Sequence, residues 1–134
     1  MLVTRQIWVV VEFSDAVVKP VSFEAIYAAR LLADSLQGTV EALCLGLEKP
    51  DQAGDLLHYG ADRVRVLNSS FFGTFSLELW LKAVGSQIDE RKPYAIIFSA
   101  TTHGKELSAS LSAKLNVGLT TDCVAIEARG REEI

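Results

Sequence analysis

The amino-acid sequence predicts a doubly wound α/β domain, with a mostly parallel sheet of five strands and helices on both of its faces. Short runs rich in β-branched residues alternate with stretches of helical periodicity, which is the pattern of repeated strand–helix–strand units. The strand runs are apolar at every position, as in 7–11 (IWVVV), and this is typical of strands covered on both faces. A chain of 134 residues makes one such domain and leaves no room for a second.

Local signals place the elements along the chain. Ser22 is the expected N-cap of the first helix and Gly38 its expected stop, while Pro93 ends the helix that precedes the fourth strand. The expected strands are 7–11, 40–45, 64–67, 95–98 and 124–126, and the expected helices are 23–37, 51–59, 77–92 and the residues after 104. Right-handed crossovers then predict the strand order 3-2-1-4-5. Ligands of such sheets bind at the carboxyl ends of the strands, which singles out the loops 13–19 and 99–104.

Composition and charge exclude several functional classes. Thirteen basic and seventeen acidic residues give a net charge of -4, so we expect no nucleic-acid partner. Cys44 and Cys123 lie far apart in apolar runs without a nearby histidine at metal-ligand spacing, so we expect no metal site and a reducing, cytoplasmic setting. The first apolar run stops at Glu12, too early for a membrane span, and we expect neither membrane insertion nor a targeting segment.

The 99–104 loop holds the candidates for a weak nucleotide site. Thr101, Thr102 and Gly104 precede a helix whose free N–H groups attract an anion, and Lys105 is adjacent. The segment departs from the Walker pattern, because serine replaces its first glycine and an acidic residue follows the lysine. The other interpretation, which the sequence favours, is that Thr101 or Thr102 caps the helix and Gly104 allows a close backbone approach.

The sequence offers no convincing catalytic constellation. Ser99, His103 and Asp122 could be named as nucleophile, base and orienting acid, but the strained GxSxG elbow is absent. A GxGxxG dinucleotide fingerprint is absent as well. We therefore expect no catalytic residue in this chain.

Four strings resemble one protein family. The segments 7–12 (IWVVVE), 28–33 (AARLLA), 59–64 (YGADRV) and 99–122 look like the N-terminal domain, or domain I, of the electron transfer flavoprotein alpha subunit. YGADRV and the helix start TTHGKEL are the most specific, and the later string GLTTDC is similar to versions found in anaerobic members. The chain departs from the family at Ala109 and Ser110, where Pro-Arg is usual.

The resemblance implies a Rossmann-like, adenine nucleotide alpha hydrolase-like domain at 1–127 and a truncated linker at 128–134. It implies a heterodimeric carrier with a beta subunit as partner. The full protein would pass electrons from flavin dehydrogenases, such as acyl-CoA dehydrogenase, to a quinone oxidoreductase or another acceptor through FAD. In the family, the C-terminal domain of the alpha subunit chiefly holds FAD. We therefore expect this chain to be a scaffold and subunit interface without its own FAD.

A different class of protein shares the predicted strand and helix order, namely adenine-nucleotide-binding modules like those of stress proteins. Their loop needs Gly, two residues, Gly, nine residues and Gly, whereas Thr101 and Lys114 stand at the first and last of these positions. This module stays open as the alternative function.

Three aromatic residues, Phe71, Phe72 and Phe75, flank Gly73 on one connection. They form either an apolar patch that a partner subunit covers or a satellite cluster under their own sheet.

Overall fold

Four strands form one parallel sheet in the computed structural model, which describes residues 5–14, 16–46, 51–67 and 76–115. They are β1 (Gln6–Val11), β4 (Thr39–Leu45), β5 (Arg63–Leu67) and β6 (Ala95–Phe98), arranged across the sheet as β5-β4-β1-β6. Val9 in β1 lies opposite Ala42 on one side and Ile97 on the other. This confirms the predicted order of the first four strands, while the predicted strand 124–126 lies outside the described residues.

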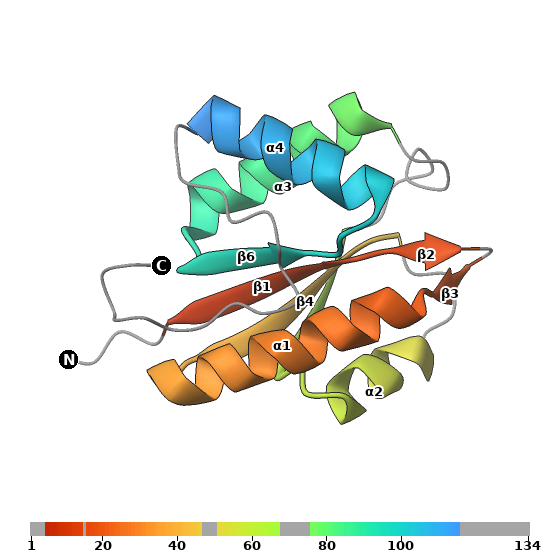
Figure 1. Cartoon of the computed structure of the whole chain (residues 1–134), viewed down its shortest axis with the longest axis vertical. Coiled ribbons are helices and arrows are strands. Elements are labelled where there is room, and N and C mark those ends of the chain that lie inside the picture. Colours follow the sequence, from red (N-terminus) through yellow and green to blue (C-terminus); the bar gives the residue numbers. More distant parts are fainter. Residues whose placement is uncertain (1–4, 15, 47–50, 68–75, 116–134) are drawn as a thin grey trace.

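Helices cover both faces of the sheet, as the doubly wound prediction requires (Figure 1). The helices α1 (Pro20–Leu36) and α2 (Asp51–His58) lie on one face, and α3 (Leu77–Arg91) and α4 (Thr102–Leu115) lie on the other. Alternate residues of β1 enter two separate cores: Val9 packs on the α1 side, whereas Trp8 and Val10 pack on the side of α3 and α4. Because both faces of β1 are buried, the strand is apolar at successive positions.

The first turn of α1 differs from the prediction, because Ser22 lies within the helix instead of at its N-cap. The helix begins at Pro20, whose ring fixes a helical φ and whose missing N–H needs no partner. Lys19 is the N-cap and makes no side-chain capping bond. The Ser22 hydroxyl instead accepts a hydrogen bond of 2.8 Å from the backbone N–H of Glu12, so it ties α1 to the end of β1.

The loop 13–19 contains a small antiparallel hairpin, formed by β2 (Phe13–Ser14) and β3 (Val17–Val18), that the sequence did not indicate. Strands of two residues are too short to show an alternating pattern. The backbone N–H of Val18 donates to Gln52 Oε1 at 2.7 Å, which attaches the hairpin to α2.

The last two helices follow the prediction with one shift. Ser76 caps the N-terminus of α3, and Lys92 takes a left-handed conformation after its last residue, just before Pro93. Helix α4 begins earlier than expected, at Thr102. Thr102 and Gly104 therefore lie in its first turn, not in the loop before it.

Candidate functional site at the carboxyl edge of the sheet

A buried carboxylate lies where the chain leaves β1. Glu12 follows the strand directly and is 5% exposed. Its Oε2 accepts a hydrogen bond of 2.6 Å from Thr101 Oγ1, and its Oε1 lies 3.4 Å from Lys19 Nζ. The contact joins the carboxyl ends of β1 and β6, whose following helices lie on opposite faces of the sheet. This is the position at which doubly wound folds bind their ligands.

Thr101 caps helix α4 while it holds Glu12. Its Oγ1 accepts a hydrogen bond of 3.0 Å from the backbone N–H of Gly104, and its carbonyl oxygen accepts from the N–H of Lys105 at 2.8 Å. A Cβ on Gly104 would lie 1.9 Å from the carbonyl oxygen of Ser99 and 3.2 Å from Glu12 Oε2. The capping interpretation is confirmed for Thr101, and so is the close approach at Gly104.

The predicted nucleotide-loop residues are thus divided between two environments. Thr101 and Gly104 lie against Glu12, whereas the side chains of Thr102 and Lys105 are exposed on the first turn of α4. A negative charge near the N-terminus of a helix stabilises it. Here the chain supplies that charge itself, at the place where an anionic ligand would bind. Nucleotide binding by this loop stays a prediction.

Sequence reasoning missed Glu12 as a member of this site. The signal that could have revealed it is an acidic residue that directly follows an apolar strand at the expected switch point of the sheet. Ser99 and His103 belong to the same edge, but Asp122 lies outside the described residues. The nucleophile arrangement therefore cannot be assembled from the described part of the chain.

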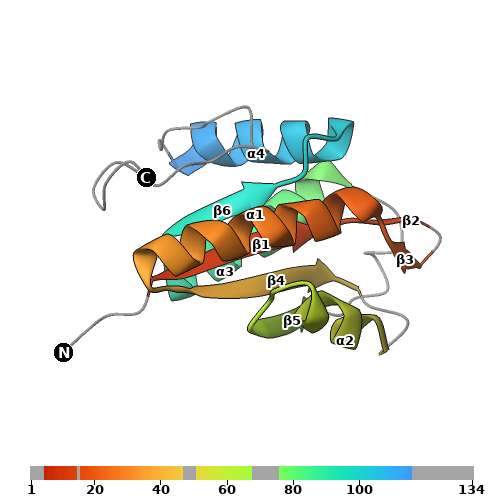
Figure 2. The ribbon, with the colours of Figure 1, turned by 60° about the horizontal axis from the view of Figure 1, so that its bottom comes forward.

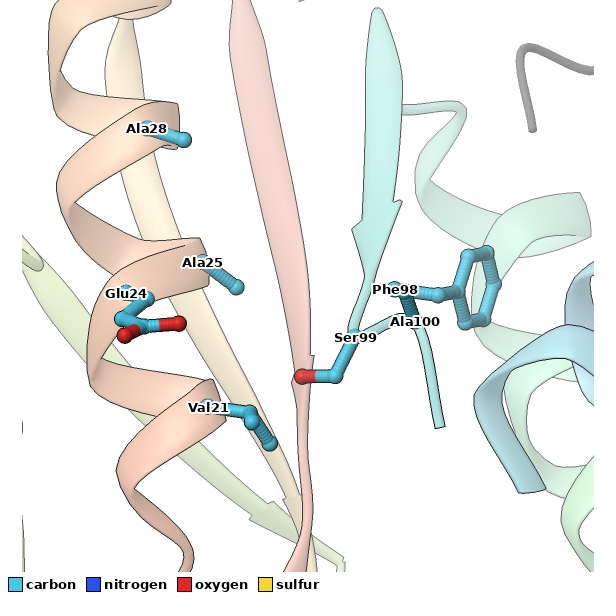
Figure 3. Close-up of a pocket in the computed structure, with 7 residues that line it drawn as sticks. All are labelled: Val21, Glu24, Ala25, Ala28, Phe98, Ser99 and Ala100. Atoms are coloured by element: carbon cyan, nitrogen blue, oxygen red, sulfur yellow. The ribbon is translucent and has the colours of Figure 1, made fainter. Parts of the chain in front are cut away.

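A hollow of about 100 Å³ lies beside this edge, between the first turns of α1 and the end of β6 (Figure 3). It is lined by Val21, Glu24, Ala25, Ala28, Phe98, Ser99 and Ala100. The Ser99 hydroxyl is buried, points toward α1 and has no hydrogen-bond partner in the described structure. Pockets that hold cofactors measure roughly 300–1,000 Å³, so this hollow does not fit a flavin.

A polar network lies at the edge of the sheet opposite the carboxyl ends of the strands. It joins two of the segments that resemble the family, 28–33 and 59–64. Arg30 in α1 donates to Asp62 Oδ2 at 2.8 Å and to the carbonyl oxygen of Gly60 at 3.1 Å. Asp62 Oδ2 also accepts from the backbone N–H of Val40 at 2.8 Å. Burial alone would raise the pKa of Asp62, but the hydrogen bonds from Val40 and Arg30 outweigh it and lower that pKa. The segments 28–33 and 59–64 are therefore parts of one structural contact.

A more deeply buried ion pair lies on the face covered by α3 and α4. Both oxygens of Glu41 accept from the guanidinium of Arg91, at 2.5 and 2.7 Å, and Arg65 Nε lies 3.4 Å from Glu41 Oε2. The same guanidinium stacks over the ring of Trp8 at 4.7 Å from its centroid. The sequence did not indicate this buried partner of Arg91, because Glu41 lies 50 residues away along the chain.

The described ranges contain no group of three or more His, Cys, Asp or Glu side chains that could hold a metal ion. None of the helices described is both long enough and apolar enough to cross a membrane.

Comparison with known proteins places these features in a family. The family model described as "Electron transfer flavoprotein domain" matches residues 7–133. The chain is 31% identical over 123 residues to the electron transfer flavoprotein subunit alpha of Clostridium acetobutylicum, covering 92% of this chain and 37% of that protein. It is 32% identical over 130 residues to the lactate dehydrogenase (NAD(+),ferredoxin) subunit LctC of Acetobacterium woodii, covering 97% of this chain and 31% of LctC.

A third relative has a different name. The protein FixB of Azorhizobium caulinodans is 33% identical over 129 residues, which cover 92% of this chain and 34% of FixB. The chain thus spans about a third of the length of these curated relatives. Because the family model covers nearly all of it, the chain belongs to the electron transfer flavoprotein family.

Proposed function

We propose that this chain acts as the N-terminal scaffold and subunit-interface domain of an electron transfer flavoprotein alpha subunit. The observation that carries the proposal is the match of residues 7–133 to the family model, together with relatives named as alpha subunits. The contact between Arg30 and Asp62 supports it, because it gives two of the family-like strings one shared structural role.

In the full protein, electrons pass from flavin dehydrogenases, such as acyl-CoA dehydrogenase, through FAD to a quinone oxidoreductase or another acceptor. The beta subunit is the partner, and the complex works in the cytoplasm. The chain itself holds no FAD and carries no catalytic residue. Two features support this role: the hollow at the end of β6 is too small for a flavin, and Glu12 takes the anion position at the start of α4.

Co-purification tests the proposal. The tagged chain is expressed together with the electron transfer flavoprotein beta subunit of the same organism, and the complex is followed by gel filtration. We expect the two to elute together, and we expect the chain alone to be colourless. Failure of the beta subunit to elute with the chain, or flavin absorbance retained by the chain alone, would contradict the proposal.

The adenine-nucleotide module remains testable in the same preparation. A nucleotide at 100 times its Kd stabilises a folded protein by about 2.7 kcal/mol. Because the Glu12 carboxylate lies against the first turn of α4, we expect neither ATP nor AMP to raise the midpoint of thermal unfolding. A clear rise with either nucleotide would favour the module over the scaffold.

A further inference from the structure

The hollow beside α1 contains a polar group that the described structure leaves unsatisfied. Ser99 is 5% exposed, and its hydroxyl has no hydrogen-bond partner among the described residues. Buried hydroxyl groups without partners destabilise a fold and are uncommon in native proteins. Figure 3 shows this hydroxyl directed across the hollow toward α1. The group therefore indicates an occupant that comes from outside the described chain.

The size of the hollow limits what that occupant can be. Its volume is about 100 Å³. A nucleotide or another cofactor needs a pocket several times larger. A single long side chain fits this volume, which makes a protein partner the matching source.

The chemistry of the lining defines the side chain further. Val21, Ala25 and Ala28 offer an aliphatic wall along α1, which suits a stem of methylene groups. The polar side chains of the lining are the Glu24 carboxylate and the Ser99 hydroxyl, and both accept hydrogen bonds. None of the lining residues is basic, and Glu24 makes no ion pair within the part of the chain that the structure describes. A side chain that complements this lining has an aliphatic stem and a positively charged nitrogen at its end.

The surroundings also suit a docking surface. Leu31 and Tyr27 on the outer face of α1 are 56% and 59% exposed. Figure 2 shows α1 in front of the sheet, with no other described helix lying over it. Side chains that carry much of the binding energy of protein interfaces, arginine among them, lie in well-packed pockets.

We propose that this hollow receives one lysine or arginine side chain of a partner protein. The aliphatic stem lies along Val21, Ala25 and Ala28, the cationic group pairs with Glu24, and an N–H group donates to Ser99 Oγ. The identity of the partner rests on the proposed function, which makes it the beta subunit of the electron transfer flavoprotein.

Binding of the beta subunit to variants of the chain tests the partner. Glu24→Lys reverses the charge at the hollow, and Ala28→Phe obstructs it from a half-exposed position. The matched controls are Glu106→Lys and Ala113→Phe, which make the same changes at exposed positions of α4. Calorimetry should show affinity at least tenfold weaker for the hollow variants and within twofold of wild type for the controls. Equal affinity of hollow variants and controls would overturn the proposal.

A probe of the hollow itself separates this proposal from the proposed function. Two-dimensional NMR of the chain alone is recorded with n-butylammonium, which resembles a lysine side chain, and with butyrate, which has the opposite charge. We expect butylammonium to shift the backbone amides of Ala25, Ala28 and Ser99, and we expect Glu24→Lys to abolish these shifts.

The outcomes of the two experiments are distinguishable. Butylammonium shifts in a chain that does not bind the beta subunit would leave the basic-side-chain site standing and refute the proposed function. Absence of those shifts, or equal shifts with butyrate, would refute the site whatever the beta subunit does.

Discussion

The change of Gly104 to alanine should weaken the fold at the carboxyl edge of the sheet. The new Cβ would lie 1.9 Å from the carbonyl oxygen of Ser99, whereas carbon and oxygen atoms in contact stay about 3.3 Å apart. The first turn of α4 must therefore move by more than an ångström. That movement separates Gly104 from its cap on Thr101 and Thr101 from Glu12.

The magnitude follows from the bonds that this movement breaks. Loss of a helix cap costs about 1 kcal/mol, and loss of a hydrogen bond to a charged group costs about 1.5–3 kcal/mol. Alanine favours a helix over glycine by about 1 kcal/mol, which offsets part of the loss. We expect Gly104→Ala to lower the free energy of unfolding by about 1.5–3 kcal/mol.

Urea denaturation, followed by the fluorescence of Trp8 and Trp80, measures this change. Gly54 in α2 provides the matched control, because a Cβ there would meet nothing within 4 Å. Gly54→Ala should raise the free energy of unfolding by about 0.5–1 kcal/mol. If Gly104→Ala were as stable as wild type, or shifted in the same direction as Gly54→Ala, the close approach at Gly104 would be refuted.

Three other changes test separate contacts. Glu41→Ala leaves the Arg91 guanidinium without its partner, and urea denaturation should show a free energy of unfolding lower by about 3–5 kcal/mol. Replacing both residues by leucine should restore much of that free energy. Equal losses for the single and the double variant would contradict this assignment of the ion pair. Burial raises the pKa of Asp62, but the hydrogen bonds from Val40 and Arg30 outweigh burial and lower that pKa. The Asp62 carboxylate therefore stabilises the folded state above about pH 4, and this stabilisation disappears as the pH falls through the lowered pKa. Unfolding curves of wild type and Asp62→Asn should therefore converge in acid, and a constant difference across pH would refute the assignment. Burial raises the pKa of the Cys44 thiol to about 12, so iodoacetamide at pH 8 should modify Cys44 in the denatured chain and not in the folded one, as peptide mass mapping would reveal.

The sequence predicted the order of the four described strands because their signals are local and strong. Each is a short apolar run between helical stretches, and the preference for right-handed crossovers then orders them. The end of α3 was predictable for the same reason, since Pro93 cannot continue a helix. The first turn of α1 was predicted wrongly, because a serine cap and a proline start are competing signals and proline at the first helical position prevailed over Ser22.

The candidate site was predictable only in part. Thr101 and Gly104 stood out because helix starts have a local signature. Glu12 lies 89 residues from Thr101 in sequence, and the pairing of Glu41 with Arg91 spans 50 residues. No periodicity or spacing encodes contacts of that range, since they exist only after β1, β4 and β6 have assembled.

The outer strand β5 shows how the sheet limits unwanted pairing. Arg63 and Arg65 lie at exposed positions of β5, at the boundary of the described sheet, and alternate with the partly buried Val64 and Val66. A strand at the border of a sheet offers unpaired N–H and C=O groups to any second strand, which is a route to aggregation. Two cationic side chains on such a strand repel a second copy of the same strand. The two arginines thus oppose pairing of β5 with a second copy of itself, and Arg65 also lies 3.4 Å from the buried carboxylate of Glu41.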